Sequence, residues 1–590
     1  MPPINMQVTE KPKDTRGALR RILSYLGKYR LLIAIILLFC VVSNVLALLG
    51  PSMAGKAINE AAAGKGKVNF DRVIYYAKWM LLTYVASSVL TIAINILMTK
   101  VSRLMAKKMR NDVFEKLMVL PVGYFDKNAT GDIISRVSYD IDVVTTCIAT
   151  DLVSIMTSVI TVLGSFGMMV SISPILSVVE LLMIPIAVVY TVHMRKVTQP
   201  IFRRRSMAYG AMNGFVEEMF TGQKTILAYS YENDVCDQFA VKNGDAGDGF
   251  HDSEYEACAM GPTINLFNNI GLGLVGMCGS ILYMFGMITL GNISSFVLYS
   301  RKFSGPINEV ANIVSEIYSA LSASERVFKL LDEEEEVKDI DNAVELTDVT
   351  GKVSLSHVRF GYDPEKTIIH DLSLDVEGGN LIAIVGPTGA GKTTIINLLM
   401  RFYDVDAGSV CVDEKDVREY TRRSLRKAYA MVLQDTWVFE GTIYDNIAYG
   451  KENATMDEVI AAAKAAHIHS FIMQLPNGYD TVIGEDGGNI SKGQKQLLTI
   501  ARAMLYDSKM LILDEATSNV DTGTERKVQA AMRNLMKGKT CFVIAHRLST
   551  IQNADKIMVL NKGDVVEMGT HDSLMDKKGF YYSLYKAQFE

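Results

Sequence analysis

The chain has 590 residues, of which 49% are hydrophobic and 21% are charged, with a formal net charge of −5. This length is too great for one hydrophobic core, and the small negative charge argues against a nucleic-acid partner. The mean hydropathy of +0.17 is high for a protein that lies wholly in water, so part of the chain is expected in a lipid bilayer. The seven cysteines are scattered singly without a CxxC pair, which argues against a zinc site.

The first 30 residues are predicted to form a polar tail and an interfacial helix. Residues 15–30 interleave leucine and isoleucine with basic side chains, which is typical of a helix lying in the cytoplasmic membrane interface. The polar start lacks the apolar stretch and cleavage site of a signal peptide, so none is expected.

Six apolar runs follow, each long enough to cross a membrane, which takes about 20 helical residues. The predicted spans are 31–51, 74–98, 146–170, 174–194, 259–286 and 293–318. Basic residues cluster before the first span, after the second and after the fourth, and the positive-inside rule places these clusters in the cytoplasm. We therefore predict an α-helical six-span transmembrane domain over residues 31–325, with both termini cytoplasmic.

The two cytoplasmic connections of this domain are unusually long. About 50 residues separate the second and third spans and about 65 separate the fourth and fifth, and both are predicted to continue as helix at about 1.5 Å per residue. Breaks are expected at Pro121–Asp126 and between Gly210 and Gly222. Two long helices joined by a short crosspiece would form a rigid arm ending outside the membrane.

Polar side chains inside the predicted spans are candidates for the cargo path. They are Glu180 in the fourth span, Asn265 and Asn269 in the fifth, and Arg301 in the sixth. Ionisable groups are costly in lipid, so these are expected to face a cavity or each other. A structural ion pair is the alternative for Glu180 and Arg301.

After a predicted linker at 326–350, the sequence alternates strand, loop and helix. A short apolar strand at 381–385 leads into the phosphate-binding pattern GxxxxGK[ST] and then a helix. The pattern and the residue after it comprise Gly386, Pro387, Thr388, Gly389, Ala390, Gly391, Lys392, Thr393 and Thr394. Backbone N–H groups of such a loop surround phosphates, Lys392 would reach the β- and γ-phosphates, and Thr393 would bind Mg²⁺. Residues 351–590 are therefore predicted to form an α/β P-loop NTPase domain that binds ATP and Mg²⁺.

A second apolar strand, at 510–513, ends in two carboxylates. Asp514 is placed to hold Mg²⁺ through water, and Glu515 to accept a proton from the attacking water. Alone this pattern means little, but after a phosphate loop it indicates nucleotide hydrolysis.

The segment Asn489–Gln494 opens a further helix, and here the sequence resembles the ATP-binding-cassette (ABC) transporter family, whose signature reads LSGGQ. The resemblance covers nearly the whole chain, with the motifs in the family's order. It implies these roles: Tyr362 stacking on adenine, Gln434 as the coupling glutamine and a Mg²⁺ ligand, Ser491, Gly493 and Gln494 as the signature that contacts ATP, Asp521 in the loop after the catalytic acid, and His546 at the γ-phosphate. With Glu515, the residues Gln434 and His546 form the implied catalytic set. Individually, Tyr362 could be a surface aromatic and Gln434 a polar residue at a strand end.

The resemblance also implies a partner chain, because this family holds ATP between the phosphate loop of one cassette and the signature of another. This chain has one membrane domain and one cassette, so it resembles a half-transporter. Lys492 stands where the signature has glycine, whereas the catalytic Glu515 is present. That combination resembles the catalytically complete subunit of heterodimeric bacterial exporters, with a homodimer as the alternative.

The order of the domains resembles bacterial multidrug and lipid exporters. It implies ATP-driven export of a small amphipathic or hydrophobic molecule across the bacterial plasma membrane by alternating access. The alternatives are a lipid or peptide exporter of the same architecture, and an ABC ATPase that serves as a sensor or channel regulator without transport. The presence of both Glu515 and His546 favours turnover.

Overall fold

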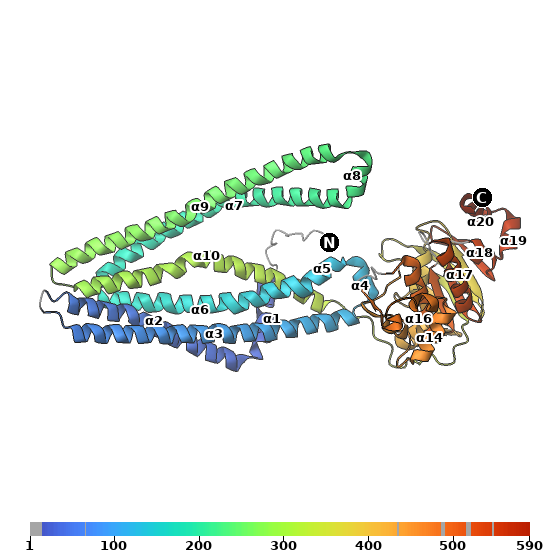
Figure 1. The fold of residues 1–590 in the computed structure, drawn as a ribbon, viewed down its shortest axis with the longest axis horizontal. Coiled ribbons are helices and arrows are strands. Elements are labelled where there is room, and N and C mark those ends of the chain that lie inside the picture. Colours follow the sequence, from blue (N-terminus) through green and yellow to red (C-terminus); the bar gives the residue numbers. More distant parts are fainter. Residues whose placement is uncertain are drawn as a thin grey trace. The chain divides into compact units, whose positions relative to one another are not determined.

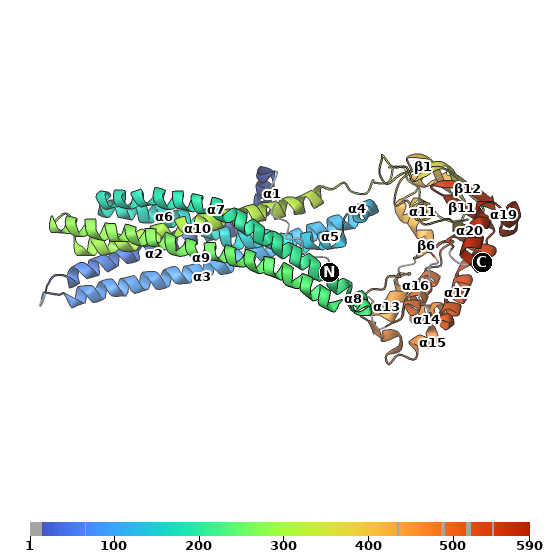
Figure 2. The same cartoon turned by 90° about the horizontal axis from the view of Figure 1, so that it is seen from above.

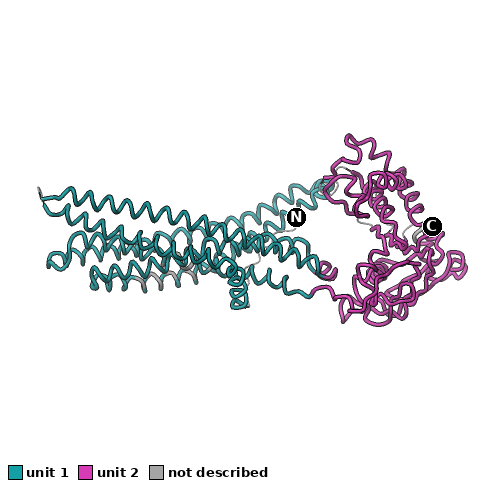
Figure 3. Tube along the Cα trace, turned by 90° about the horizontal axis from the view of Figure 1, so that it is seen from below, with its two compact units in different colours: residues 1–120, 128–334 teal, residues 121–127, 335–590 magenta. Residues whose placement is uncertain are grey.

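The computed structural model describes residues 14–64, 67–433, 436–484, 490–514, 521–545 and 548–589. The chain divides into two compact units (Figure 3). Unit 1 is Met1–Leu120 with Asn128–Glu334, and unit 2 is Pro121–Lys127 with Glu335–Glu590. The short segment at 121–127 thus packs with the second half of the chain. The predicted domain limits at 31–325, 326–350 and 351–590 stay predictions.

Unit 1 is built from helices (Figure 1). They are α1 (Thr15–Gly27), α2 (Arg30–Ala61), α3 (Phe70–Val119), α5 (Thr130–Ser135), a π-helical turn (Arg136–Asp140), α6 (Ile141–Ile172), α7 (Pro174–Thr221), α8 (Gln223–Tyr229), α9 (Glu232–Met284) and α10 (Leu290–Asp332). Polar N-caps start several of them. Asn69 caps α3, Ser173 caps α7 ahead of Pro174, and Thr289 caps α10.

The helices of unit 1 are far longer than a bilayer needs. α3, α7 and α9 have 50, 48 and 53 residues, so each is about 70–80 Å long. The predicted continuation of the spans into long helices is confirmed. Within the described residues, four helical segments are long and apolar enough to cross a membrane: Arg30–Ala61, Phe70–Val119, Thr130–Ile172 and Glu232–Met284. The count of six spans stays a prediction.

Short crosspieces interrupt the two long connections that the sequence predicts to be cytoplasmic. α4 (Val122–Lys127) follows Pro121, and Leu120 before the proline has the extended backbone that proline favours in its neighbour. The second break falls at the end of the predicted stretch between Gly210 and Gly222: α7 continues through Gly210 and ends at Thr221, and α8 begins at Gln223. One glycine costs a helix about 1 kcal/mol, which the packing of α7 along α9 outweighs.

α10 holds the centre of unit 1 together. Phe296, Tyr299 and Phe303 are buried on it. The Tyr299 hydroxyl donates to the Leu48 carbonyl of α2 at 2.6 Å, and the Phe303 ring stacks on Phe166 of α6 at 5.9 Å. α7 and α9 pair with each other as a hairpin through α8, and the α8 end of this hairpin diverges from α3, α6 and α10 (Figure 1).

Unit 2 is an α/β fold. Its strands are β1 (Val353–Phe360), β2 (Ile369–Val376), β3 (Leu381–Val385), β4 (Ala407–Val412), β5 (Lys415–Asp416), β6 (Tyr429–Val432), β7 (Gly441–Thr442), β8 (Val482–Ile483), β9 (Met510–Asp514), β10 (Thr540–Ile544), β11 (Lys556–Asn561) and β12 (Asp564–Gly569). Its helices are α11 (Lys392–Leu399), α12 (Arg422–Lys427), α13 (Ile443–Ala448), α14 (Met456–Ala465), α15 (His469–Ile472), α16 (Lys492–Tyr506), α17 (Thr522–Met536), α18 (Leu548–Gln552), α19 (His571–Lys577) and α20 (Phe580–Phe589). The predicted fold class, a helical membrane part fused to an α/β part, is confirmed.

The larger sheet of unit 2 has the order β12-β11-β3-β10-β9-β6. β11, β3, β10, β9 and β6 run parallel, so their carboxyl ends meet at one edge. The smaller antiparallel sheet has the order β2-β1-β4-β5. Alternate residues of β3 enter two cores: Ile382 and Ile384 pack with the antiparallel sheet, and Ala383 and Val385 pack with the helices. β3 is therefore held on both faces, and this fixes the loop that follows it.

Candidate functional site

The loop between β3 and α11 has a geometry that depends on glycine. Gly389 and Gly391 have φ values of 80° and 99°, which side chains of L-residues rarely adopt. A Cβ atom on Gly386 would lie 2.3 Å from the Leu560 carbonyl oxygen of β11. Pro387 and Thr388 of the loop and Thr393 of α11 are exposed, whereas Ala390 and Thr394 are buried. The loop therefore faces solvent from a fixed base at the start of α11.

The Lys392 side chain folds back over this loop. Its Nζ donates to the carbonyl oxygens of Gly386 at 2.7 Å and Pro387 at 3.0 Å. Burial lowers the pKa of Lys392, and the Asp514 carboxylate partly opposes this. A phosphate bound over the loop would supply the negative charge that this ammonium group needs.

Asp514 ends β9, which is separated from β3 by β10 alone. Its carboxylate and the Thr393 hydroxyl offer the oxygen donors that Mg²⁺ prefers. In the described part of the chain, no group of three or more His, Cys, Asp and Glu could hold a metal ion. These two residues therefore fit a magnesium ion whose other ligands are phosphate and water oxygens.

Tyr362 is held beside the phosphate-loop helix. Its hydroxyl accepts from Asn397 Nδ2 at 2.9 Å and donates to Thr394 Oγ1 at 3.4 Å, both on α11. Its ring meets Phe360 and Tyr403 edge to face, with centroids 5.0 and 4.9 Å away. Sequence reasoning missed Asn397 and Tyr403. The only available signal was the three-residue spacing of Thr394 and Asn397 on one face of α11.

The predicted signature residues lie at the start of α16. Ser491 Oγ accepts from the Gln494 amide at 3.3 Å, while Gln494 Oε1 accepts from the Ser491 amide at 2.8 Å, forming a capping box. A serine hydroxyl that accepts in this way can still donate its own proton to an anion. Gly493 is buried in the first turn.

Lys492 stands where the family's signature has glycine. It is the first residue of α16 and has a helical backbone, which an L-residue adopts without strain. Lys492 therefore replaces the family's glycine without backbone strain at its own position, and the difference that remains is a charged side chain at the helix start.

Asp521 caps the next helix. Its Oδ2 accepts from the Thr524 amide at 2.9 Å, and this backbone hydrogen bond lowers the pKa of the Asp521 carboxyl. The role of Asp521 at ATP stays a prediction.

The structure therefore brings together one set of predicted residues and separates another. The phosphate loop, Tyr362 and Asp514 gather around α11, whereas Ser491, Gly493 and Gln494 start α16, which packs with α13, α14 and α17 (Figure 2). Gln434, Glu515 and His546 lie outside the described residues. They follow β6, β9 and β10 in the chain, three neighbouring strands of the parallel sheet.

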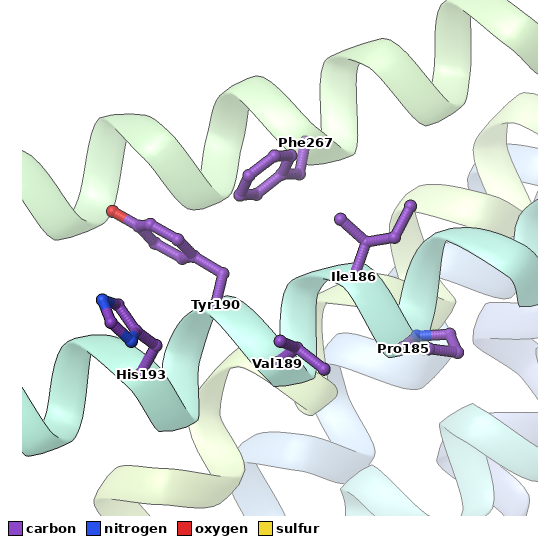
Figure 4. A pocket seen from close by; sticks show the side chains of 6 residues that line it. All are labelled: Pro185, Ile186, Val189, Tyr190, His193 and Phe267. Atoms are coloured by element: carbon purple, nitrogen blue, oxygen red, sulfur yellow. The ribbon is translucent and has the colours of Figure 1, made fainter.

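A cavity of about 540 Å³ opens between α7 and α9 (Figure 4). It is lined by Pro185, Ile186, Val189, Tyr190 and His193 of α7 and by Phe267 of α9. The rings of Tyr190 and Phe267 meet edge to face at 5.3 Å. The lining is apolar apart from one hydroxyl and one imidazole, so the cavity suits a molecule with a hydrophobic body and a polar end.

The predicted cargo residues lie elsewhere in unit 1. Glu180 is only 6% exposed, and its Oε1 accepts from Ser300 at 2.6 Å and Ser304 at 3.3 Å, both on α10. Its partners are thus hydroxyls rather than the Arg301 guanidinium, so the suggested ion pair is not found among the described residues. Arg301, Asn265 and Asn269 are exposed on the isolated chain.

Comparison with known proteins finds ABC transporter sequences matching both halves of the chain. The family model described as ABC transporter transmembrane region matches residues 33–307, and the one described as ABC transporter matches residues 369–518. The chain is 42% identical to the uncharacterized ABC transporter ATP-binding protein YfiC of Bacillus subtilis, over 98% of this chain and 96% of the relative.

Two further matches extend this result. A fatty acid ABC transporter ATP-binding/permease protein of Mycobacterium bovis is 41% identical over 81% of this chain and 76% of its own length. The solved structure of a bacterial Atm1-family ABC exporter with ATP bound aligns with a TM-score of 0.75 at 28% identity, covering 98% of this chain and 99% of that one.

Proposed function

Since this chain belongs to the ABC transporter family, as an exporter-type half-transporter whose cassette is an ATPase coupled to transport, we propose that two such halves export an amphipathic molecule across a bacterial plasma membrane by alternating access. The observation that carries the proposal is that the phosphate loop lies at the start of α11 and Ser491 at the start of α16, two helices that lie apart within unit 2 (Figure 2). Each can complete an ATP site only with its counterpart on a second chain.

In the proposed cycle, ATP first joins the two cassettes. The Lys392 ammonium group leaves the loop carbonyl oxygens and contacts phosphate oxygens, and the signature serine of the other half, the counterpart of Ser491, donates a hydrogen bond to the γ-phosphate. Thr393, Asp514 and Gln434 would hold Mg²⁺, which would neutralise phosphate charge. Glu515 then accepts a proton from the attacking water while His546 contacts the γ-phosphate. Loss of that shared phosphate separates the cassettes again.

The arms of unit 1 are the proposed route from the cassettes to the spans. α8 joins the tips of α7 and α9 and has no buried residue. Leu227 and Tyr229 on it are 56% and 75% exposed. Exposed apolar side chains on a short crosspiece support a docking role against the cassette of the partner chain. Both termini of the chain are cytoplasmic in this arrangement.

The identity of the partner is a separate part of the proposal. Lys492 adds a positive charge at the helix end that meets the other chain's ATP, and this departure favours a heterodimer in which the second half brings a different signature. A homodimer is the alternative, because the backbone at Lys492 is unstrained.

ATP hydrolysis by the purified chain alone tests which dimer forms. In lipid nanodiscs we expect the single chain to bind ATP but to turn over slowly. Lys492→Gly is expected to raise turnover, because it restores the glycine of the signature and removes the added positive charge. Phosphate release is measured, with Lys495→Gly three residues further along α16 as the control. Full turnover by the unmodified chain, unaffected by Lys492→Gly, would rule out an obligate heterodimer.

The cargo class is proposed from the α7–α9 cavity. Its apolar lining, with Tyr190 and His193 as polar groups, favours a single-chain amphiphile, and the fatty-acid transporter among the relatives supports the same choice. A larger lipid, a peptide, or a regulatory role without cargo are the alternatives. We propose that Arg301, which does not line this cavity, meets the anionic end of the cargo at another point of its path, and that Glu180 acts by fixing α7 to α10 through Ser300 and Ser304.

Stimulation of ATP hydrolysis by oleate tests this cargo class. Arg301→Gln is expected to weaken the stimulation about tenfold, since hydrogen bonds to charged groups contribute about 1.5–3 kcal/mol. Glu180→Leu removes both serine contacts and should also lower it, whereas Glu180→Gln keeps an acceptor and should act weakly. The same stimulation is measured in Asn265→Ala and Asn269→Ala, and a decrease is expected if these two side chains also contact the cargo. Unchanged stimulation in both Arg301→Gln and Glu180→Leu would remove this assignment.

A further inference from the structure

A pair of tyrosines in unit 2 connects the proposed adenine site with α4. The Tyr403 ring lies 4.9 Å from the Tyr362 ring at an interplanar angle of 82°, and the Tyr403 hydroxyl donates to Asp126 Oδ2 at 2.5 Å. A Cβ atom on Gly123 of α4 would lie 3.0 Å from the Tyr403 ring. Both α4 and Tyr403 belong to unit 2, so this contact lies inside one compact body (Figure 3).

In the hydrogen bond between Tyr403 and Asp126, the tyrosine hydroxyl is the donor and the carboxylate is the acceptor. Burial and the neighbouring Asp126 carboxylate raise the pKa of Tyr403, so its hydroxyl stays protonated and donates. A carboxylate acceptor strengthens such a bond, while the exposure of Asp126 moderates it. The bond therefore joins Tyr403 to α4 at a position that solvent still reaches.

The other end of the pair is fixed to the phosphate loop. Tyr362 is hydrogen-bonded to Thr394 and Asn397, and these lie on α11, whose first residue is Lys392. One continuous set of contacts thus leads from the phosphate-loop helix through Tyr362 and Tyr403 to Asp126. Edge-to-face rings constrain each other's orientation, so a base stacked on Tyr362 would also restrict Tyr403.

We propose that Tyr403 is a positioning residue that couples occupancy of the adenine site to α4, so that the arm responds to the base of ATP as well as to its phosphates. The proposal rests on the proposed function, in which Tyr362 stacks on adenine and α4 is the crosspiece of the first arm. The coupling is reciprocal: displacement of α4 changes the affinity for the base by the same factor. A purely structural tyrosine would pack against Tyr362 without transmitting base occupancy.

Hydrogen exchange of the α4 backbone in the full-length protein measures this coupling. The non-hydrolysable ATP analogue AMP-PNP with Mg²⁺ is expected to slow exchange in the peptide that covers Val122–Lys127. Tripolyphosphate, which fills the phosphate loop without a base, is expected to slow it little. Tyr403→Phe keeps the ring and removes the hydroxyl, so AMP-PNP should bind nearly as well while the protection of α4 falls about threefold to tenfold, as expected for one hydrogen bond.

Matched variants separate the coupling from a loss of packing. Tyr444→Phe also removes a hydroxyl, one that donates to the Ala454 carbonyl at 2.6 Å, and should leave α4 unchanged. Asp126→Asn keeps an acceptor and should retain most of the protection, whereas Asp126→Ala should match Tyr403→Phe. The double variant Asp126→Ala with Tyr403→Phe should be no worse than either alone, because both remove the same contact.

These measurements distinguish a failure of the proposed function from a failure of the coupling. Failure of the unmodified protein to bind AMP-PNP would overturn the proposed function and the coupling together. Normal AMP-PNP binding with undiminished α4 protection in Tyr403→Phe and Asp126→Ala would overturn the coupling alone. Equal protection by tripolyphosphate and AMP-PNP would overturn the sensing of the base. Should Tyr403→Phe fail to fold, Asp126→Ala alters an exposed side chain and gives the same readout.

Discussion

Replacing Glu515 with glutamine is expected to lower ATP turnover about 100-fold to 10,000-fold, which is the usual contribution of a general base. Glutamine keeps the size of the side chain but cannot accept the proton of the attacking water. Binding of ATP should persist, because Lys392, Thr393 and the phosphate loop are unchanged. Phosphate release and nucleotide binding are measured on the assembly purified through a tag on this chain, with any partner half that accompanies it.

The control for this variant is Glu452→Gln, which neutralises an exposed carboxylate on another loop of unit 2 and should keep full turnover. Retention of more than a tenth of the turnover by Glu515→Gln would contradict the role of Glu515 as the base. Simultaneous loss of ATP binding would instead indicate that the residue acts in the structure of the loop after β9.

Lys392→Ala is expected to weaken ATP binding and turnover together, by roughly 100-fold to 1,000-fold, as found when one charge-stabilising donor is removed from an active site. The ammonium group of Lys392 already lies over the loop, within 3.0 Å of two carbonyl oxygens. Because burial disfavours its charge, it gains most when a phosphate arrives. Binding of a fluorescent ATP analogue measures the first effect and phosphate release the second.

Lys464→Ala on α14 is the matched control, since it removes an exposed lysine of the same unit. The melting temperature of both variants is compared with that of the unmodified chain. An unchanged melting temperature with lost binding would support the phosphate contact. Wild-type affinity in Lys392→Ala would show that nucleotide is held elsewhere and would contradict the assignment of the loop.

The phosphate site could be predicted from the sequence because its determinants are local. The apolar strand, the glycines and the lysine of residues 381–392 follow one another, and the backbone angles of Gly389 and Gly391 are the ones that only glycine adopts readily. Ser491 and Gln494 are similar, since serine and glutamine three residues apart are a pattern of helix starts. The long helices of unit 1 could likewise be predicted from apolar length and the absence of breakers.

Contacts between distant parts of the chain could not be predicted from local patterns. Tyr403 and Asp126 are 277 residues apart, and no local pattern joins them. The sequence limited the second helix break only to the stretch from Gly210 to Gly222, and the structure places it at the far end, because α7 gains more from packing along α9 than one glycine costs.

The hydrogen-bond partners of Glu180 could not be predicted from the sequence either. Its neighbours on α10 are Ser300 and Ser304, which lie one helical turn apart on one face, while Arg301 is turned about 100° away from that face. Composition and hydropathy identify the span that carries each residue, but the rotation of one helix against another decides which side chains meet. That rotation is set by the packing of whole helix faces, and it becomes fixed only when the helices come together.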